Sequence, residues 1–115
     1  MPSLLHLPLD PLSRKIRIVL GEKKITASLA VEPIWERRHE FLSINPAGTV
    51  PVFIEDDGTT ISTSQAIAEY LEETSTEPAL IFGTALQRAE IRRLCNWFDV
   101  KFNTEVTEYL SLIHI

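Results

Sequence analysis

The stretch Asn45-Pro46-Ala47-Gly48-Thr49-Val50-Pro51-Val52-Phe53-Ile54 decides the fold of this chain. Its Asn-Pro and Ala-Gly pairs indicate a tight loop, and the residues that follow predict a short apolar strand. Proline has no N–H to donate to a sheet, so Pro51 must lie at an edge or beside a ligand. A cis Val50–Pro51 bond would turn the main chain of Val50 outward, where it could pair with an extended peptide.

A helix is predicted shortly after this strand, at Ser62-Thr63-Ser64-Gln65-Ala66-Ile67. Ser62 is the expected N-cap, and Gln65 would complete a capping box. The first turn would present the Ser64 hydroxyl and unpaired N–H groups, which suit a carboxylate. The loop offers main-chain groups that can pair with a peptide, and the helix N-terminus offers a binding site for an anion. Together they predict a site for a small peptide.

The remaining pattern predicts a mixed α/β sheet with the element order β-α-β-(α)-β-β-α. Asp10 is expected to cap the first helix and Pro11 to open it. Apolar residues at helical spacing and β-branched segments place the other elements. The predicted strands are 3–7, 26–31, 52–54 and 59–62, and the predicted helices are 11–21, a short 33–41 and 64–73. The last of these helices is expected to bury Ala66, Ile67, Tyr70 and Leu71.

A long amphipathic helix is predicted from Thr84, after a stretch rich in Ser, Thr, Pro and Gly that is typical of a linker. Its expected apolar stripe comprises Leu86, Ile91, Leu94, Cys95, Phe98 and Phe102, with Val106, Tyr109 and Ile113 as an extension. Such a stripe needs partners to cover it, and the rest of the sequence provides none. We therefore interpret the chain as a fragment. The alternative is an intact protein that dimerises through this helix.

Composition excludes several classes of function. A net charge of −5 argues against nucleic acid or an anionic membrane as the partner, and no apolar run approaches a membrane span. A single cysteine, Cys95, fits a reducing cytoplasm, and we expect it to be a buried packing residue. His39 and His114 lack metal-ligand spacing, so no metal is expected. His6 is expected to be a hydrogen-bonded core residue rather than a catalyst.

The motif N-P-A-G-x-V-P, a short hairpin and then S-x-A-I-x-E-Y-L resembles the N-terminal domain of the glutathione transferase superfamily, over residues 4–110. The resemblance implies a thioredoxin-like domain in residues 1–74, a linker in 75–83 and the first helix of a truncated all-α domain in 84–115. It implies a cytoplasmic transferase, homodimeric when complete, that conjugates glutathione to an electrophile. The electrophile cannot be named, because the second domain supplies most of its pocket.

The resemblance also implies roles for individual residues. Val50 would pair its main chain with the cysteinyl unit of glutathione, Pro51 would fix that geometry, and Ser64 would take the γ-glutamyl carboxylate. Ser13, at the start of the first helix, is the candidate for stabilising the thiolate. The alternative is that Ser13 is a first-turn helix residue with no further role.

Two positions depart from the superfamily pattern. Thr63 stands where an acidic residue usually meets the glutamyl ammonium of glutathione, and we keep it among the expected binding residues. Thr49 stands where Lys, Arg or Gln usually helps to hold the glycyl carboxylate. Charge-assisted hydrogen bonds are stronger than neutral ones, so each change could cost about 1–2 kcal/mol of binding free energy.

A narrower resemblance is carried by residues 8–15, 32–36 and 97–102. They are similar to an alphaproteobacterial branch that includes a division protein, which binds the tubulin-like cytokinetic GTPase and does not use glutathione. This implies an alternative function, a non-catalytic interaction protein. The run 35–41 is read either as a solvated turn anchored by Trp35 and Phe41 or as a partner-binding ridge.

Overall fold

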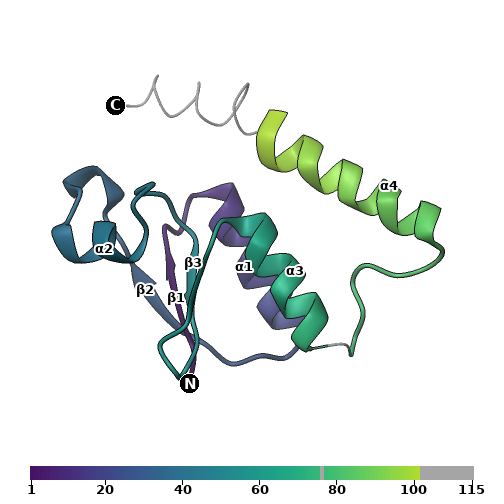
Figure 1. Cartoon of the computed structure of the whole chain (residues 1–115), viewed down its shortest axis with the longest axis horizontal. Coiled ribbons are helices and arrows are strands. Elements are labelled where there is room, and N and C mark those ends of the chain that lie inside the picture. Colours follow the sequence, from purple (N-terminus) through teal and green to yellow (C-terminus); the bar gives the residue numbers. More distant parts are fainter. Residues whose placement is uncertain (76, 102–115) are drawn as a thin grey trace. The chain divides into compact units, whose positions relative to one another are not determined.

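The computed structural model describes residues 1–75 and 77–101, in two compact units of which the second begins at Ala79. The first unit is built on a four-stranded sheet (Figure 1). Its elements are β1 (Ser3–His6), α1 (Pro11–Glu22), β2 (Ser28–Val31), a 3₁₀ turn (Ile34–Glu36), α2 (His39–Ile44), β3 (Val52–Ile54), β4 (Thr60–Ser62) and α3 (Ser64–Thr74). This order confirms the predicted β-α-β-(α)-β-β-α arrangement.

The sheet is mixed, with the strand order β2-β1-β3-β4. Strand β1 runs parallel to β2 and antiparallel to β3, and β3 and β4 form an antiparallel hairpin. Strands β1 and β3 are therefore the two central strands. Because β1 and β3 are short and apolar, both of their faces can be covered, as the thioredoxin-like arrangement requires.

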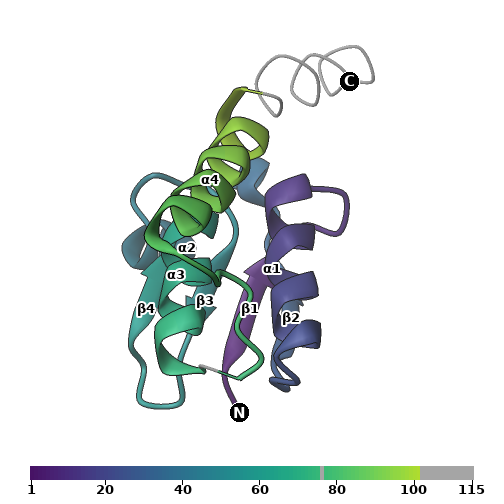
Figure 2. The ribbon, with the colours of Figure 1, turned by 90° about the vertical axis from the view of Figure 1, so that its right-hand side faces the viewer.

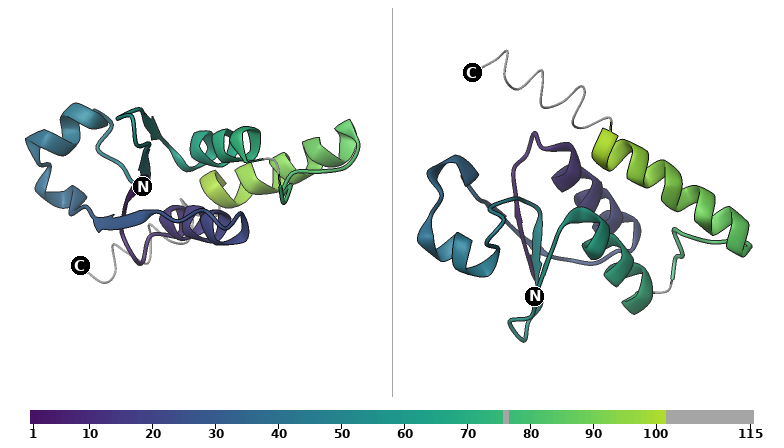
Figure 3. Two further views of the ribbon diagram at one scale, coloured as in Figure 1. Left: turned by 90° about the horizontal axis from the view of Figure 1, so that it is seen from below. Right: turned by 45° about the horizontal axis from the view of Figure 1, so that its top comes forward.

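Each face of the sheet carries its own hydrophobic core. Helices α1 and α3 lie side by side on one face, and α2 lies on the other (Figures 1, 2 and 3). The core under α1 and α3 comprises Leu4, Ile16, Leu20, Phe53, Ile67 and Leu71. The core on the α2 side comprises Phe41, Val50 and Val52. Neighbouring residues of β3 therefore serve opposite cores, which follows from the alternation of side chains along a strand.

The start of α1 is as predicted. Asp10 is the N-cap, and its Oδ2 accepts the Ser13 N–H at 2.8 Å, while Pro11 occupies the first helical position. The helix passes Gly21 and ends at Glu22.

The predicted cap of α3 is wrong by one residue. Ser62 belongs to β4, where it is the register partner of Val52, so Thr63 becomes the N-cap and its Oγ1 accepts the Ala66 N–H at 3.3 Å. Ile67 and Leu71 are buried as predicted, whereas Ala66 is exposed. Tyr70 is half-buried and its hydroxyl donates to Glu55 Oε2 at 2.6 Å.

The second unit begins with α4 (Ala85–Asn96), which continues as a π-helical turn over 97–101. A capping box fixes its start: Thr84 Oγ1 accepts the Gln87 N–H at 3.2 Å, and Gln87 Oε1 accepts the Thr84 N–H at 2.8 Å. No residue of α4 is buried, and Cys95 is half-buried rather than buried. The predicted stripe residues Phe102, Val106, Tyr109 and Ile113 lie outside the described residues.

Candidate functional site

The strand register brings three connecting segments together at one end of the strands. Val52 is the partner of Leu5 on one side and of Ser62 on the other. The chain just before Val52, just after β1 and just after Ser62 must therefore lie near one another. Val50 and Pro51 lie in the segment before β3, Thr63 and Ser64 follow β4, and Ser13 lies in the first turn of α1. Figure 2 shows the N-terminal ends of α1 and α3 at the same end of the unit.

The loop before β3 is shaped by Asn45, which is only 5% exposed. Its Nδ2 donates to the Thr49 carbonyl at 2.7 Å and to Thr49 Oγ1 at 3.3 Å, and its Oδ1 accepts the Ala47 N–H at 3.3 Å. Its own carbonyl accepts the Gly48 N–H at 2.9 Å. Both oxygens of Thr49 therefore accept hydrogen bonds from within the loop. Asn45 is a positioning residue to which sequence reasoning gave no role, although the Asn-Pro pair pointed to a turn there.

Val50 presents its main chain at the end of this loop. Its side chain is buried in the core on the α2 side, and the Val50–Pro51 bond is cis. In the described part of the chain, no residue forms a hydrogen bond with the Val50 N–H or C=O. The side chain is anchored while the main-chain donor and acceptor stay available, which is the geometry that strand-like pairing with a peptide needs.

Thr63 and Ser64 begin α3 in an unusual conformation. Thr63 has φ 72° and ψ 140°, a region that costs a β-branched residue about 1–3 kcal/mol. Its side chain is exposed, whereas Ser64 is buried. A strained, exposed residue at a helix N-terminus is a typical feature of a binding site.

Ser13 is fully buried, with 0% of its surface exposed. Its hydroxyl donates to Asp10 Oδ2 at 2.8 Å, and its Oγ faces the Leu7 N–H at 3.4 Å. Ser13 therefore lies in the first turn of α1, and its hydroxyl hydrogen is used in the hydrogen bond to Asp10.

Arg37 is a second residue to which sequence reasoning gave no role. Its backbone is left-handed, with φ 47°. A Cβ built on Gly48, whose φ is +71°, would lie 3.8 Å from Arg37 Nη1 and 3.3 Å from Leu42 Cδ2. The guanidinium thus lies over the loop that precedes Thr49. Within the described residues Arg37 forms no ion pair, so its charge is available beside the loop at Gly48. The only signal in the sequence is the pair of arginines in the run 35–41.

The neighbouring Arg38 holds this segment in place. It makes a two-pronged ion pair with the buried Glu32, through Nη2–Oε1 at 2.6 Å and Nε–Oε2 at 3.0 Å. The hydrogen bond to Glu32 raises the pKa of Arg38. The predicted anchors of the run 35–41 are half right: Phe41 is buried, but Trp35 is 70% exposed.

The other candidate groups do not join this site. His39 is an exposed residue at the start of α2, and His114 lies outside the described residues. His6 is buried as predicted, but its Nδ1 has no hydrogen-bond partner among the described residues. Residues 1–75 and 77–101 contain no cluster of His, Cys, Asp and Glu that could hold a metal ion. Over the same ranges, no helix combines the length and hydrophobicity of a membrane span.

Comparison with known proteins gives consistent matches. Residues 4–79 match the family model for the glutathione S-transferase N-terminal domain. FtsZ-localized protein A of Caulobacter vibrioides is 44% identical over 94% of this chain and 49% of that protein. A crystal structure of a glutathione S-transferase from Rhodospirillum rubrum is 51% identical, with a TM-score of 0.90 over 94% of this chain and 49% of that one.

A third match is to a structure that contains glutathione. A glutathione S-transferase from Methylobacillus flagellatus, solved with glutathione bound, is 29% identical, with a TM-score of 0.76 over 86% of this chain and 49% of that one. The chain thus spans about half the length of each of these three proteins.

Proposed function

The chain belongs to the glutathione S-transferase family through its N-terminal domain, and on that premise we propose that it binds glutathione at the end of β3 and β4, at Val50, Pro51, Thr63 and Ser64. One observation carries the proposal. Val52 pairs with Ser62 just before α3, and two residues before Val52 the Val50 main chain has no hydrogen-bond partner among the described residues, which supports a peptide-binding site here. The resemblance to a structure with bound glutathione supports it.

Each group of glutathione would have its own partner at this site. The cysteinyl unit pairs with the Val50 main chain, and Pro51 fixes the direction of that pairing. The γ-glutamyl carboxylate takes the first turn of α3 at Ser64, where the helix dipole favours an anion. Thr63 meets the glutamyl ammonium with a neutral oxygen. Arg37 compensates for the neutral Thr49 by offering its charge to the glycyl carboxylate.

The conjugation step would depend on Ser13. A hydroxyl that donates to the glutathione sulfur favours the thiolate over the thiol, and the thiolate attacks an electrophile. The second domain of the complete protein would supply the electrophile pocket, and family members of this kind pair as homodimers in the cytoplasm. In this structure the Ser13 hydroxyl donates to Asp10, so it would first have to turn away from Asp10 to donate to the sulfur.

The test is a thermal-shift titration of the complete protein with glutathione. A ligand that binds only the folded state adds about 2.7 kcal/mol of stability at one hundred times its Kd. A saturable rise at millimolar glutathione, reduced in Ser64→Ala and retained in the exposed control Ser43→Ala, is the expected result. No rise in the unmodified protein would overturn the proposal.

A second candidate function is a non-catalytic interaction protein in cell division. It is favoured by the complete burial of Ser13 and by the similarity to FtsZ-localized protein A. The partner would be the tubulin-like division GTPase. Co-sedimentation of the complete protein with the assembled GTPase polymer tests it directly. Binding that survives Ser13→Ala supports this function, and no co-sedimentation counts against it.

A further inference from the structure

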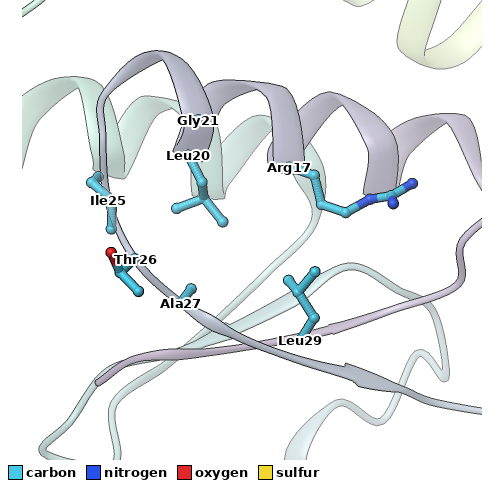
Figure 4. Close-up of a pocket in the computed structure, with 7 residues that line it drawn as sticks. All are labelled: Arg17, Leu20, Gly21, Ile25, Thr26, Ala27 and Leu29. Atoms are coloured by element: carbon cyan, nitrogen blue, oxygen red, sulfur yellow. The ribbon is translucent and has the colours of Figure 1, made fainter.

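Strand β2 is an edge of the sheet that leaves its apolar residues uncovered. It consists of Ser28, Leu29, Ala30 and Val31, all of them exposed, with 51% of Leu29 and 58% of Val31 open to solvent. Figure 4 shows Leu29 pointing toward α1 across an open pocket of about 290 Å³, so the helix does not cover it. The other edge strand, β4, differs because its apolar residue, Ile61, packs against the core.

The outer side of β2 also has a free main chain. The Ser28 N–H donates to the Pro2 carbonyl at 2.8 Å, toward β1, and the alternation of a strand turns the main-chain groups of Ala30 the same way. Those of Leu29 and Val31 therefore point outward, and nothing in the described part of the chain forms a hydrogen bond with them. Natural proteins commonly protect such an edge with a charged residue or a proline, and β2 contains neither.

We propose that β2 pairs with the β2 of a second copy of this chain, antiparallel and centred on Ala30. In that register Leu29 lies opposite Val31 of the second copy, and their outward N–H and C=O groups exchange hydrogen bonds. Ala30 faces its own counterpart at a non-hydrogen-bonded position, where side chains come closest and a small one fits best. The same residues thus form both sides of the contact, as a two-fold axis requires. This proposal is independent of glutathione binding.

The charges that flank β2 favour a second copy in this orientation. The nearest exposed charges on either side of the strand are Lys24 before it and Glu36 after it, equally far along the chain from Ala30. Lys24 forms no ion pair within the described residues. Antiparallel pairing brings the basic end of one strand to the acidic end of the other, and the uncharged strand has nothing to repel its copy.

An engineered disulfide tests this register and also traps a small, transient contact. In the full chain with Cys95→Ser, Ala30→Cys should give a disulfide-linked dimer when oxidised with copper phenanthroline. The Cα atoms of a non-hydrogen-bonded pair lie about 4.5 Å apart, which a disulfide can span. Ser28→Cys in the same background is the matched exposed control. Its two copies would lie roughly 13 Å apart along the strands, so the yield of linked dimer should be at least tenfold lower.

A second substitution tests whether the strand itself makes the contact. Val31→Lys puts a charge on the edge strand, so combined with Ala30→Cys it should lower the yield of linked dimer at least fivefold. Val100→Lys makes the same change at a valine of the second unit that is 57% exposed, and it should leave the yield unchanged. No linked dimer with Ala30→Cys, an equal yield with Ser28→Cys, or a yield that survives Val31→Lys would each overturn the proposal. A chain that dimerises only through α4 would give the first of these results.

Discussion

The Ser13 hydroxyl donates a hydrogen bond of 2.8 Å to Asp10 Oδ2, and the same carboxylate oxygen accepts the Ser13 N–H at 2.8 Å. A serine hydroxyl has one proton, so Ser13 can give it to Asp10 or to a ligand sulfur but not to both. The two functions proposed above differ on this point. A transferase needs the proton to turn toward the ligand, whereas an interaction protein needs only the helix cap.

Ser13→Ala in the complete protein separates the two functions. If Ser13 stabilises the thiolate, turnover of glutathione with chlorodinitrobenzene should fall about 10- to 100-fold, the equivalent of one hydrogen bond to a charged group. The KM for glutathione should change less than turnover, because the interaction forms mainly with the developing thiolate. Turnover equal to that of the unmodified protein would assign Ser13 to the cap alone.

Thr63→Asp should strengthen glutathione binding. Aspartate is as good an N-cap as threonine, so α3 keeps its start, and the new carboxylate can meet the glutamyl ammonium that Thr63 meets with a neutral oxygen. The gain expected from a charge-assisted bond is about tenfold in Kd. Calorimetric titration measures it. The matched control Thr59→Asp lies in the turn before β4 and should leave Kd unchanged; a gain there equal to that at Thr63 would point to a general charge effect.

Substitutions of Thr63 should also change the stability of the fold. Its φ of 72° is strained for any residue with a Cβ, and its Oγ1 caps α3. Thr63→Gly removes the strain and loses only a few tenths of a kcal/mol of capping. The free energy of unfolding, measured by urea denaturation, should therefore rise by about 1 kcal/mol. Thr63→Ala keeps the strain and loses the cap, and should destabilise by about 1 kcal/mol. A stability order other than Gly, Thr, Ala would contradict this account of the backbone.

Local chemistry predicted much of this fold. Asp10 and Pro11 start α1, and the Val50–Pro51 loop leads into β3, because caps and proline act within a few residues of themselves. The cap of α3 was misplaced for the opposite reason. Ser62 is as good a cap as Thr63 by sequence, but pairing with the distant Val52 draws it into β4.

The parts of the site that sequence reasoning missed depend on contacts between distant segments. Arg37, which lies over Gly48, has a left-handed backbone, and its neighbour Arg38 is paired with Glu32. Neither the φ of an arginine nor the ion pair leaves a pattern in the sequence. The burial of Ser13 likewise follows from tertiary packing around the start of α1 and not from its place in the first turn.

Lys23 is a further long-range contact with a measurable consequence. Its side chain is fully buried, and Nζ donates to the carbonyls of Ser75, 52 residues away, and of Pro78 at 2.9 Å, while Glu72 Oε2 lies at 3.4 Å. Lys23→Met removes the donor and leaves these oxygens without it, so the free energy of unfolding should fall by about 1–3 kcal/mol. Urea denaturation measures the change. Lys24→Met alters the exposed neighbour and should change stability by less than about 0.5 kcal/mol.

The stability of the fold should depend on pH through the protonation of His6. Burial lowers the pKa of His6 below its usual value of 6.5, and the charge of Arg17 lowers it further. The unfolded chain therefore binds the proton more readily, and stability is lost as pH falls below 6.5 toward the folded pKa, by at most about 1.4 kcal/mol per pH unit. His6→Leu also removes a buried nitrogen that has no partner in the described part of the chain, so the urea midpoint should change less between pH 7 and pH 5 than in the unmodified protein. The carboxyls of Asp57 and Glu90, whose pKa values are also lowered, titrate below this window. A slope as steep in His6→Leu as in the unmodified chain would assign the acid sensitivity to other groups.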